Sequence, residues 1–275
     1  MTTYHFHKMH GLGNDFILID ARQQAFDLPA PQLSSLADRH TGIGCDQWLI
    51  IEPPRTHEAC ASYRIFNADG SSAEQCLNGL RCIGLYLSRT QQQSTLVVDG
   101  PTGLARLMVG DDHQVGVELP PPEFGAGLTG WRQRDTGGAE IIELNVLGKT
   151  FKGSAVSMGN PHLVIFTDDC DAARRQYGLA VSKHPGFSKG VNAGFARISG
   201  NQLHLAVYER GSGPTKACGS GACAAAAAAI RHHQLSSPVT VRQPGGPIVV
   251  DWAGAGQPLT LTGPACYVFT GEFDL

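Results

Sequence analysis

The sequence predicts an α+β fold built from two similar halves, and three observations lead to this prediction. Eleven short β-type runs, from FILID at 16–20 to CYVFTGEF at 266–273, alternate with turn residues. Two helical stretches, Leu77–Arg89 and Gly219–His233, are apolar on nearly every side, and a helix of that kind is buried. The same set of features also occurs twice along the chain. We therefore expect strands to wrap around each of two central buried helices.

The internal repeat consists of four features that recur in the same order at offsets of 142 to 146 residues. Each match alone is weak, but the shared order and spacing indicate a duplication. We expect an N-terminal half at 1–120 and a C-terminal half at 121–265, with the last strand, 266–275, as a candidate to return to the first half. The four pairs are Asn14 with Asn160, Gln47 with Asn192, Asn67 with Glu209, and Cys76 with Cys218.

Two further segments punctuate this plan. Pro31–His40 is typical of a short surface helix, with a proline near its start. The stretch Pro120–Gly138, PPPEFGAGLTGWRQRDTGG, is rich in proline and glycine near the middle of the chain. We therefore expect it to be a linker between the halves.

Composition excludes several classes of protein. A chain of 275 residues can bury a large core without metal or disulfide support. Its formal net charge is −3, with 21 basic and 24 acidic residues and no basic block, which argues against nucleic acid or a membrane as a partner. Its start lacks the apolar stretch of an export signal, and its longest apolar run, Ala222–Ile230, is too short to span a bilayer. We expect a cytoplasmic protein with reduced thiols.

The repeated cysteines, Cys76 and Cys218, each precede a predicted buried helix. The first N–H groups and the macrodipole of a helix favour an anion, so we expect them to lower the thiol pKa. If two similar halves pack through the same face, their cysteines converge on one cleft. One thiolate can then remove a proton from a carbon while the opposite thiol delivers a proton to the other face. The chemistry predicted is inversion of a carbon centre, without metal or pyridoxal cofactor.

Six segments resemble the diaminopimelate epimerase family in order and spacing, from about Lys8 to near the C-terminus. The resemblance implies a cofactor-independent, two-base epimerase that interconverts LL- and meso-diaminopimelate for lysine and peptidoglycan synthesis, as a cytoplasmic homodimer. It also implies two similar domains, each a sheet-rich barrel around a central helix. The segments are HGLGNDF (10–16), FNADGS (66–71), QCLNGLRC (75–82), SMGNPH (157–162), VNAGF (191–195) and YERGSGPTKACGSGACA (208–224).

The same resemblance implies roles for individual residues. Cys76 and Cys218 would be the acid and the base, exchanging roles with the direction of the reaction. His162 and Glu209 match residues that tune the two thiols. Backbone N–H groups of Leu77, Asn78, Gly219 and Ser220 would hold the carboxylate at the reacting carbon. The rest of an amino-acid substrate would be bound by Asn14, Gln47, Asn67, Asn160, Asn192, Glu209 and Arg210.

One departure from the family keeps alternatives open. Where the family has glycine after its first catalytic cysteine, this chain has Leu77, whose side chain either turns into the core or narrows the site. A racemase of another amino acid, such as histidine or a basic one, is therefore a second hypothesis. A third is a non-catalytic amino-acid-binding protein in which Cys76 and Cys218 form a disulfide switch. Cys82 and Cys223, inside the helices, are expected to be packing residues.

Overall fold

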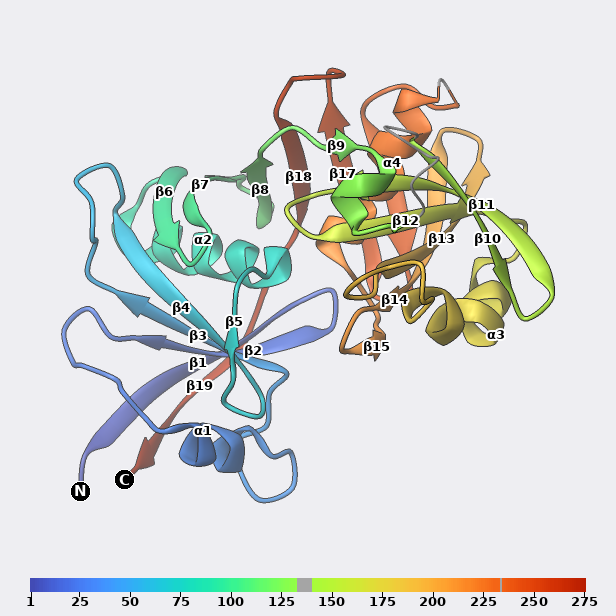
Figure 1. Cartoon of the computed structure of the whole chain (residues 1–275). Helices are drawn as coiled ribbons and strands as arrows, with labels where there is room; N and C mark the ends of the chain where they lie inside the picture. The colour runs from blue at the N-terminus through green and yellow to red at the C-terminus, as the bar shows by residue number, and fades with distance from the viewer. Residues whose placement is uncertain (133–139, 233) are drawn as a thin grey trace. The chain divides into compact units, whose positions relative to one another are not determined.

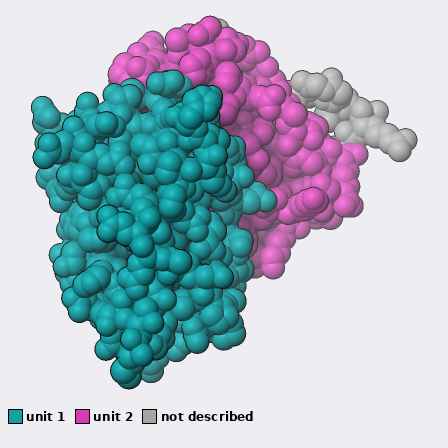
Figure 2. Space-filling view, turned by 90° about the vertical axis from the view of Figure 1, so that its left-hand side faces the viewer, with its two compact units in different colours: residues 1–118, 262–275 teal, residues 119–261 magenta. Residues whose placement is uncertain are grey.

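The computed structural model describes residues 1–132, 140–232 and 234–275, which form two compact units. Unit 1 contains Met1–Glu118 and Thr262–Leu275, and unit 2 contains Leu119–Leu261 (Figures 1 and 2). The last strand of the chain therefore lies in the first unit. Within the described residues, no helix is both long and apolar enough to cross a membrane.

Unit 1 pairs its strands in a mixed sheet. β1 and β2 are antiparallel, β2 and β3 are parallel, and β3 and β4 are antiparallel. β4 runs parallel to β6, which forms a hairpin with β7, and β19 pairs antiparallel with β1. The elements are β1 (Thr3–Gly11), β2 (Asn14–Asp20), α1 (Ala30–Ala37), β3 (Gln47–Glu52), β4 (Ala61–Asn67), β5 (Ser72–Ala73), α2 (Leu77–Gln91), β6 (Thr95–Gly100), β7 (Gly103–Val109), β8 (Gln114–Leu119) and β19 (Cys266–Asp274).

Unit 2 repeats this order of elements. β11 and β12 are antiparallel, β12 and β13 are parallel, β13 and β14 are antiparallel, and β14 runs parallel to β16. The elements are β9 (Glu123–Phe124), η1 (Ala126–Thr129), β10 (Ile141–Val146), β11 (Lys149–Ser157), β12 (Pro161–Phe166), α3 (Cys170–Ser182), β13 (Asn192–Ser199), β14 (Gln202–Glu209), β15 (Gly213–Pro214), α4 (Gly219–Arg231), β16 (Val239–Gln243) and β17 (Gly246–Trp252). β18 (Leu259–Pro264) begins in unit 2 and continues into unit 1 from Thr262 on.

Register confirms that the two units are copies of one plan. Phe16 of β2 lies opposite Gln47 of β3, and His162 of β12 lies opposite Asn192 of β13 in the same parallel arrangement. In both units the next strand is antiparallel and is followed by a two-residue strand and then by the buried helix. The predicted α+β fold of two similar domains is therefore confirmed.

The central helices are buried as predicted. α2 contacts β1, β2, β3, β6 and β7, and α4 contacts β11 to β14, β16 and β17 (Figure 1). From Ala222 to Ala229, no residue of α4 has exposed surface. In α2, a Cβ added at Gly79 would lie 2.9 Å from Leu49 Cδ2. Small residues therefore let the strands approach both helices closely.

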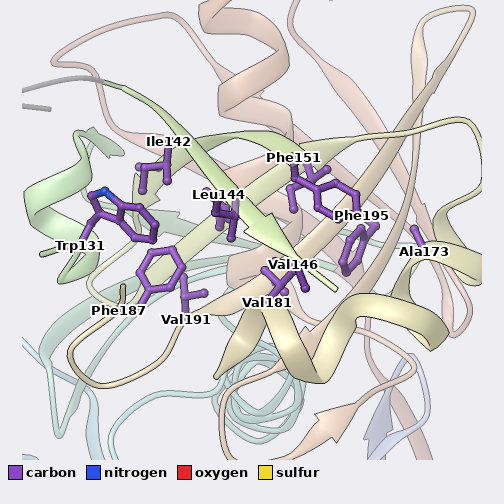
Figure 3. Close-up of a cluster of buried hydrophobic side chains, with 14 of the residues drawn as sticks. Trp131, Ile142, Leu144, Val146, Phe151, Ala173, Val181, Phe187, Val191 and Phe195 are labelled. Atoms are coloured by element: carbon purple, nitrogen blue, oxygen red, sulfur yellow. The ribbon is translucent and has the colours of Figure 1, made fainter. Parts of the chain in front are cut away.

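The structure corrects the expected linker at Pro120–Gly138. Its first part is folded into unit 2, because β9 pairs with β11 and both Ala126 and Trp131 are buried in a hydrophobic cluster. Figure 3 shows Trp131 in this cluster. Proline and glycine here shape turns in a packed segment, and glycine at Gly125 and Gly130 supplies positive φ angles. Residues 133–139 of the expected linker lie outside the described residues.

Several elements were not predicted from the sequence. α3 is the main one, and it packs Ala173 and Val181 against the cluster that contains Phe195 (Figure 3). The strands that were missed are β1, β3, β11, β13 and β18, together with the two-residue strands β5, β9 and β15. The predicted surface helix α1 is present but runs over Ala30–Ala37.

The cap of α3 gives a stability prediction. The Asp169 carboxylate accepts a hydrogen bond from the backbone N–H of Ala172 at 2.9 Å. Asp169→Ala should lower the free energy of unfolding by about 1 kcal/mol, because a helix N–H loses its partner. Asp169→Asn should lose less, and Asp168→Ala is the matched control. Urea denaturation checks this, and equal losses in Asp169→Ala and Asp168→Ala would contradict it.

Candidate active site

One edge of the sheet in unit 1 gathers three predicted amide side chains. Asn14 begins β2, Gln47 begins β3 and Asn67 ends β4. β2 and β3 are parallel, so their first residues lie at the same edge of the sheet. β4 is antiparallel to β3, so its last residue lies at that edge as well. Gln47 lies opposite Asn67, and its Nε2 donates a 3.0 Å hydrogen bond to Asn67 Oδ1.

Cys76 lies at the start of α2 as its N-cap residue, with extended backbone angles. Its thiol donates to Asn14 Oδ1 at 3.4 Å, and Asn78 Nδ2 donates to the same oxygen at 3.3 Å. The first N–H groups of an α-helix lack partners within the helix, so Leu77 and Asn78 are at the positions where an anion is stabilised. Unit 1 therefore brings together Asn14, Cys76, Leu77 and Asn78 as one half-site.

Leu77 does not need the conformation that only glycine adopts readily. It is the first residue of α2, and it is not among the described non-glycine residues with positive φ. Its side chain is buried, as is that of Leu80 on the same turn. The replacement of the family glycine is thus compatible with the helix and with its backbone N–H position.

Unit 2 contains the equivalent half-site. Cys218 is the N-cap residue of α4 and is 4% exposed. Its Sγ lies 3.7 Å from Ser220 Oγ, which accepts from Asn160 Nδ2 at 3.3 Å. The same asparagine presents its Oδ1 to His162 Nε2 at 3.0 Å, and the ring nitrogen donates because an amide oxygen only accepts. Gly219 and Ser220 begin the helix, as Leu77 and Asn78 do in unit 1.

The end of β14 supplies the charged members of this half-site. Glu209 accepts a 2.5 Å hydrogen bond from the Thr215 hydroxyl. The backbone N–H of Arg210 donates to Asn192 Oδ1 at 2.9 Å. Arg210 also lines a hollow of about 440 Å³ together with Lys189 and other residues. Asn192, Glu209 and Arg210 therefore lie together at one edge of unit 2.

Electrostatics at Cys218 correct one prediction. Burial raises the pKa of the Cys218 thiol well above its usual value, and the nearby Glu209 carboxylate raises it further. Hydrogen bonds from Gly221 and Ser220 at the helix start act in the opposite direction but are outweighed. The helix start thus acts in the expected direction, but the expected net lowering of the Cys218 pKa is wrong because desolvation is the larger effect.

The two neighbouring ionisable groups have shifted pKa values as well. Burial raises the pKa of Glu209, and the hydrogen bonds from Thr215 and Cys218 compensate only in part. Burial lowers the pKa of His162 to about 3, and the positive charge of Arg210 contributes. His162 is therefore neutral at physiological pH, and Glu209 binds a proton more readily than an exposed carboxylate.

Three residues that contact the members of these half-sites were not predicted from the sequence. Thr215 donates to Glu209, Gln243 Oε1 accepts from the backbone N–H of Cys218 at 2.8 Å, and Asp46 accepts from Asn14 Nδ2 at 3.3 Å. Thr215 lies in the segment at 208–224 that resembles the family, and Asp46 directly precedes the predicted binding residue Gln47. Both residues could therefore have been found from their neighbours in the sequence. Gln243 is 25 residues from Cys218, and nothing in the sequence links the two.

Comparison with known proteins then decides the family. The sequence model of the diaminopimelate epimerase family matches residues 6–124 and 154–268. The chain belongs to the diaminopimelate epimerase family. Diaminopimelate epimerases of Ectopseudomonas mendocina and Pseudomonas entomophila are 41% and 42% identical to it over 274 residues. In both cases the match covers 98% of this chain and 99% of the relative.

Solved structures of more distant proteins share the fold. A hydroxyproline epimerase from Agrobacterium vitis has a TM-score of 0.69 at 14% identity, covering 98% of this chain and 92% of its own. A Bacillus anthracis phenazine biosynthesis protein of the PhzF family has a TM-score of 0.67 at 14% identity, with both chains fully covered. At this identity the likeness concerns the fold alone. The duplicated arrangement of this family member is therefore shared with proteins of distant sequence.

Acid titration tests the buried histidine. The pKa of His162 is about 3 in the folded protein against 6.5 for the ordinary group, so the folded state resists protonation. The contribution of neutral His162 to the free energy of unfolding is complete above pH 6.5. As the pH falls toward 3, the unfolded chain binds a proton at this residue and the folded protein does not, so the free energy of unfolding decreases by about 1.4 kcal/mol per pH unit. Unfolding free energies measured from pH 7 to 4 should therefore fall less steeply for His162→Gln than for the parent.

The matched control is His5→Gln, because the His5 side chain is 70% exposed. This variant should keep the steep pH dependence of the parent. If His162→Gln and His5→Gln lose stability with the same slope as the parent, the buried neutral state of His162 is contradicted.

Proposed function

We propose that this chain catalyses the interconversion of LL-2,6-diaminopimelate and meso-2,6-diaminopimelate, a step in lysine and peptidoglycan precursor synthesis, without a cofactor. The observation that carries the proposal is the repetition, in a member of this family, of a cysteine N-cap on a buried helix. Each unit supplies one thiol at a helix start, with asparagine and backbone N–H groups beside it. Two equivalent proton carriers are what inversion of a carbon centre requires.

The proton transfers balance over one turnover. The base cysteine, as a thiolate, takes the α-hydrogen as a proton and becomes a thiol. The carbanion that remains takes a proton on its opposite face from the acid cysteine, which becomes a thiolate. Cys76 and Cys218 thereby exchange protonation states, and the reverse reaction restores them. No redox change and no leaving group are involved.

Backbone N–H groups support the charged intermediate. Deprotonation of the α-carbon moves negative charge onto the adjacent carboxylate, and donors already pointing at that position stabilise it. The N–H groups of Leu77 and Asn78 in α2 and of Gly219 and Ser220 in α4 lie at helix starts, where the macrodipole has its positive end. We assign the α-carboxylate to these donors.

Glu209 and His162 set the state of Cys218. The thiol and the Glu209 carboxylate lie close enough to affect each other's pKa, and burial makes Glu209 a better proton acceptor. Glu209 can therefore take the thiol proton when a thiolate is needed. Neutral His162 adds no positive charge and fixes the Asn160 amide by its hydrogen bond. These two residues tune the thiol in the proposed mechanism.

The remaining contacts recognise the zwitterionic end of the substrate. Arg210 suits a bidentate grip on the distal carboxylate, and Glu209 can pair with an ammonium. Amide side chains supply both donors and acceptors for the same groups. The proposed binding amides are Asn14, Gln47, Asn67, Asn160 and Asn192.

We also propose that the enzyme is a cytoplasmic homodimer, as the family resemblance implies. Val268 and Phe269, two consecutive residues of β19, have 54% and 49% of their surface exposed. Contact with a partner would remove these two apolar side chains from water. A second copy of the chain is the partner we propose.

Removal of either thiol tests the two-base reaction. Cys76→Ala and Cys218→Ala should each lose on the order of 10²-fold or more in epimerisation, the usual contribution of a positioned acid or base. The measurement is NMR of α-hydrogen exchange and inversion of meso-diaminopimelate in deuterated water under reducing conditions.

Matched controls are Cys82→Ala and Cys223→Ala, which remove buried thiols from the interior of the same helices. Both should keep near-parental kcat after allowance for folded fraction. Inversion that survives in both Cys76→Ala and Cys218→Ala would exclude the two-thiol mechanism. A parent protein that binds the ligand without exchanging hydrogen would instead favour a binding protein.

Arg210 tests the substrate assignment. Arg210→Gln should lower kcat/KM for diaminopimelate about 10- to 100-fold, because a charge-assisted contact to the distal carboxylate is lost. Its activity on lysine, which lacks that carboxylate, should change little. Arg242→Gln is the control, since that exposed residue contacts Gln202. A parent enzyme that racemises lysine or histidine as fast as it acts on diaminopimelate would contradict the assignment.

A further inference from the structure

Four charged side chains of unit 1 form an ion network beside Asn14. Arg39 Nη2 lies 2.5 Å from Asp15 Oδ1 and 2.7 Å from Asp46 Oδ1, so one guanidinium joins both carboxylates. Lys8 Nζ lies 2.5 Å from Asp15 Oδ2 and also donates to the carbonyl of Gly44. None of these residues belongs to the proposed catalytic or binding set.

Hydrogen bonds within this network join the start of β2 to the residue before β3. Asp15 N–H donates to Asp46 Oδ2 at 3.1 Å, and Asp46 N–H donates to Asp15 Oδ1 at 3.2 Å. Burial opposes ionisation of Asp15, but hydrogen bonds from Arg39 and Lys8 outweigh it and hold the pKa of Asp15 well below its usual range. The start of β2 is therefore fixed to the residue that precedes β3.

This network dictates how the Asn14 amide is oriented. Asn14 Nδ2 donates to Asp46 Oδ2 at 3.3 Å. A carboxylate paired with arginine accepts hydrogen bonds and does not donate, so a rotated amide would place two acceptors against each other. The amide oxygen must consequently face the other way, toward the Cys76 thiol at 3.4 Å and Asn78 Nδ2 at 3.3 Å.

The equivalent asparagine of unit 2 is oriented differently. Asn160 turns its oxygen to His162 and its Nδ2 to Ser220, whose hydroxyl contacts Cys218. Asn14 therefore presents an acceptor, its Oδ1, to Cys76. Asn160 presents a donor, its Nδ2, to the Ser220 hydroxyl that lies between it and Cys218. An acceptor stabilises a protonated thiol, because only the thiol form can donate to it.

We propose that Asp46, held by Arg39, is a positioning residue that orients Asn14 so that Cys76 is kept as a thiol, ready to act as the acid. The role in the reaction rests on the proposed epimerase function. The effect on the Cys76 thiol itself does not, since it follows from the contacts of unit 1. Asp46 acts through Asn14 and touches neither the thiol nor the substrate in this assignment.

The test compares Asp46→Asn with the parent in two measurements. The first is the rate at which iodoacetamide alkylates each cysteine at pH 7, followed by peptide mass spectrometry. In Asp46→Asn the hydrogen bond from Asn14 Nδ2 to the Asp46 carboxylate is weakened, so Asn14 can turn its Nδ2 toward the Cys76 sulfur. The negative charge of Asp46 is also removed. Both changes favour the thiolate of Cys76. Cys76 should react roughly threefold faster or more, because the thiolate is the reactive form, while Cys218 is unchanged.

The second measurement is steady-state epimerisation. kcat should fall about 10- to 100-fold, the scale of a misplaced catalytic group. The matched control is Asp20→Asn, because Asp20 also pairs with an arginine, Arg22 at 2.6 Å, at the other end of β2. That variant should keep the parental alkylation pattern and kcat. Asp46→Ala, which removes the acceptor altogether, should exceed Asp46→Asn in both effects.

The outcomes separate this proposal from the proposed function. Parental alkylation of Cys76 in both Asp46 variants, or a fall in kcat matched by Asp20→Asn, would overturn the positioning role. Faster alkylation of Cys76 alone, with the fold intact by thermal denaturation, supports it even if diaminopimelate is not the substrate. A parent enzyme inactive on diaminopimelate would overturn only the function.

Discussion

The alanine-rich helix α4 has no exposed surface along eight consecutive residues, so strands must approach it from several sides. α2 meets the same requirement with leucines and with glycines where strands come closest. A helix enclosed in this way meets solvent and ligands mainly at its ends. Its N-terminal N–H groups and the residue that precedes them become the place for anion chemistry, and in both units that residue is a cysteine.

Duplication supplies two such helix starts, and a few replacements make them unequal. Phe16 lies at the register position that His162 occupies in unit 2, and Asn67 ends its strand where Glu209 ends the equivalent one. Cys218 therefore has a half-buried carboxylate and a neutral histidine within its network, whereas Cys76 has amides oriented by ion pairs. Equal positions with unequal electrostatics suit a reaction in which one thiol gives a proton and the other takes one.

The buried helices and the cysteines at their starts could be predicted because each depends on residues that are close in sequence. The repeat could be predicted because short local motifs recur in the same order at offsets of 142 to 146 residues. α3 was missed although α1 lies between the equivalent strands of unit 1, so the repeat itself held the signal. β3 has four consecutive buried apolar residues rather than alternation, and β13 begins Asn-Ala-Gly, which are poor strand formers. The pKa of Cys218 and the contacts of Asp46 and Gln243 depend on burial and on distant segments, which the sequence does not show.

In the proposed reaction, one thiol takes the proton that leaves the α-carbon and a different thiol supplies the proton that arrives. The most direct measurement follows LL-diaminopimelate in deuterated water at early times, with the isotope at the α-carbon determined separately in substrate and product. A two-thiol reaction predicts that the meso product carries deuterium at the inverted centre while the remaining substrate keeps its hydrogen. Product that retains the substrate's own hydrogen would show that a single group moves it, which would contradict the two-thiol reaction.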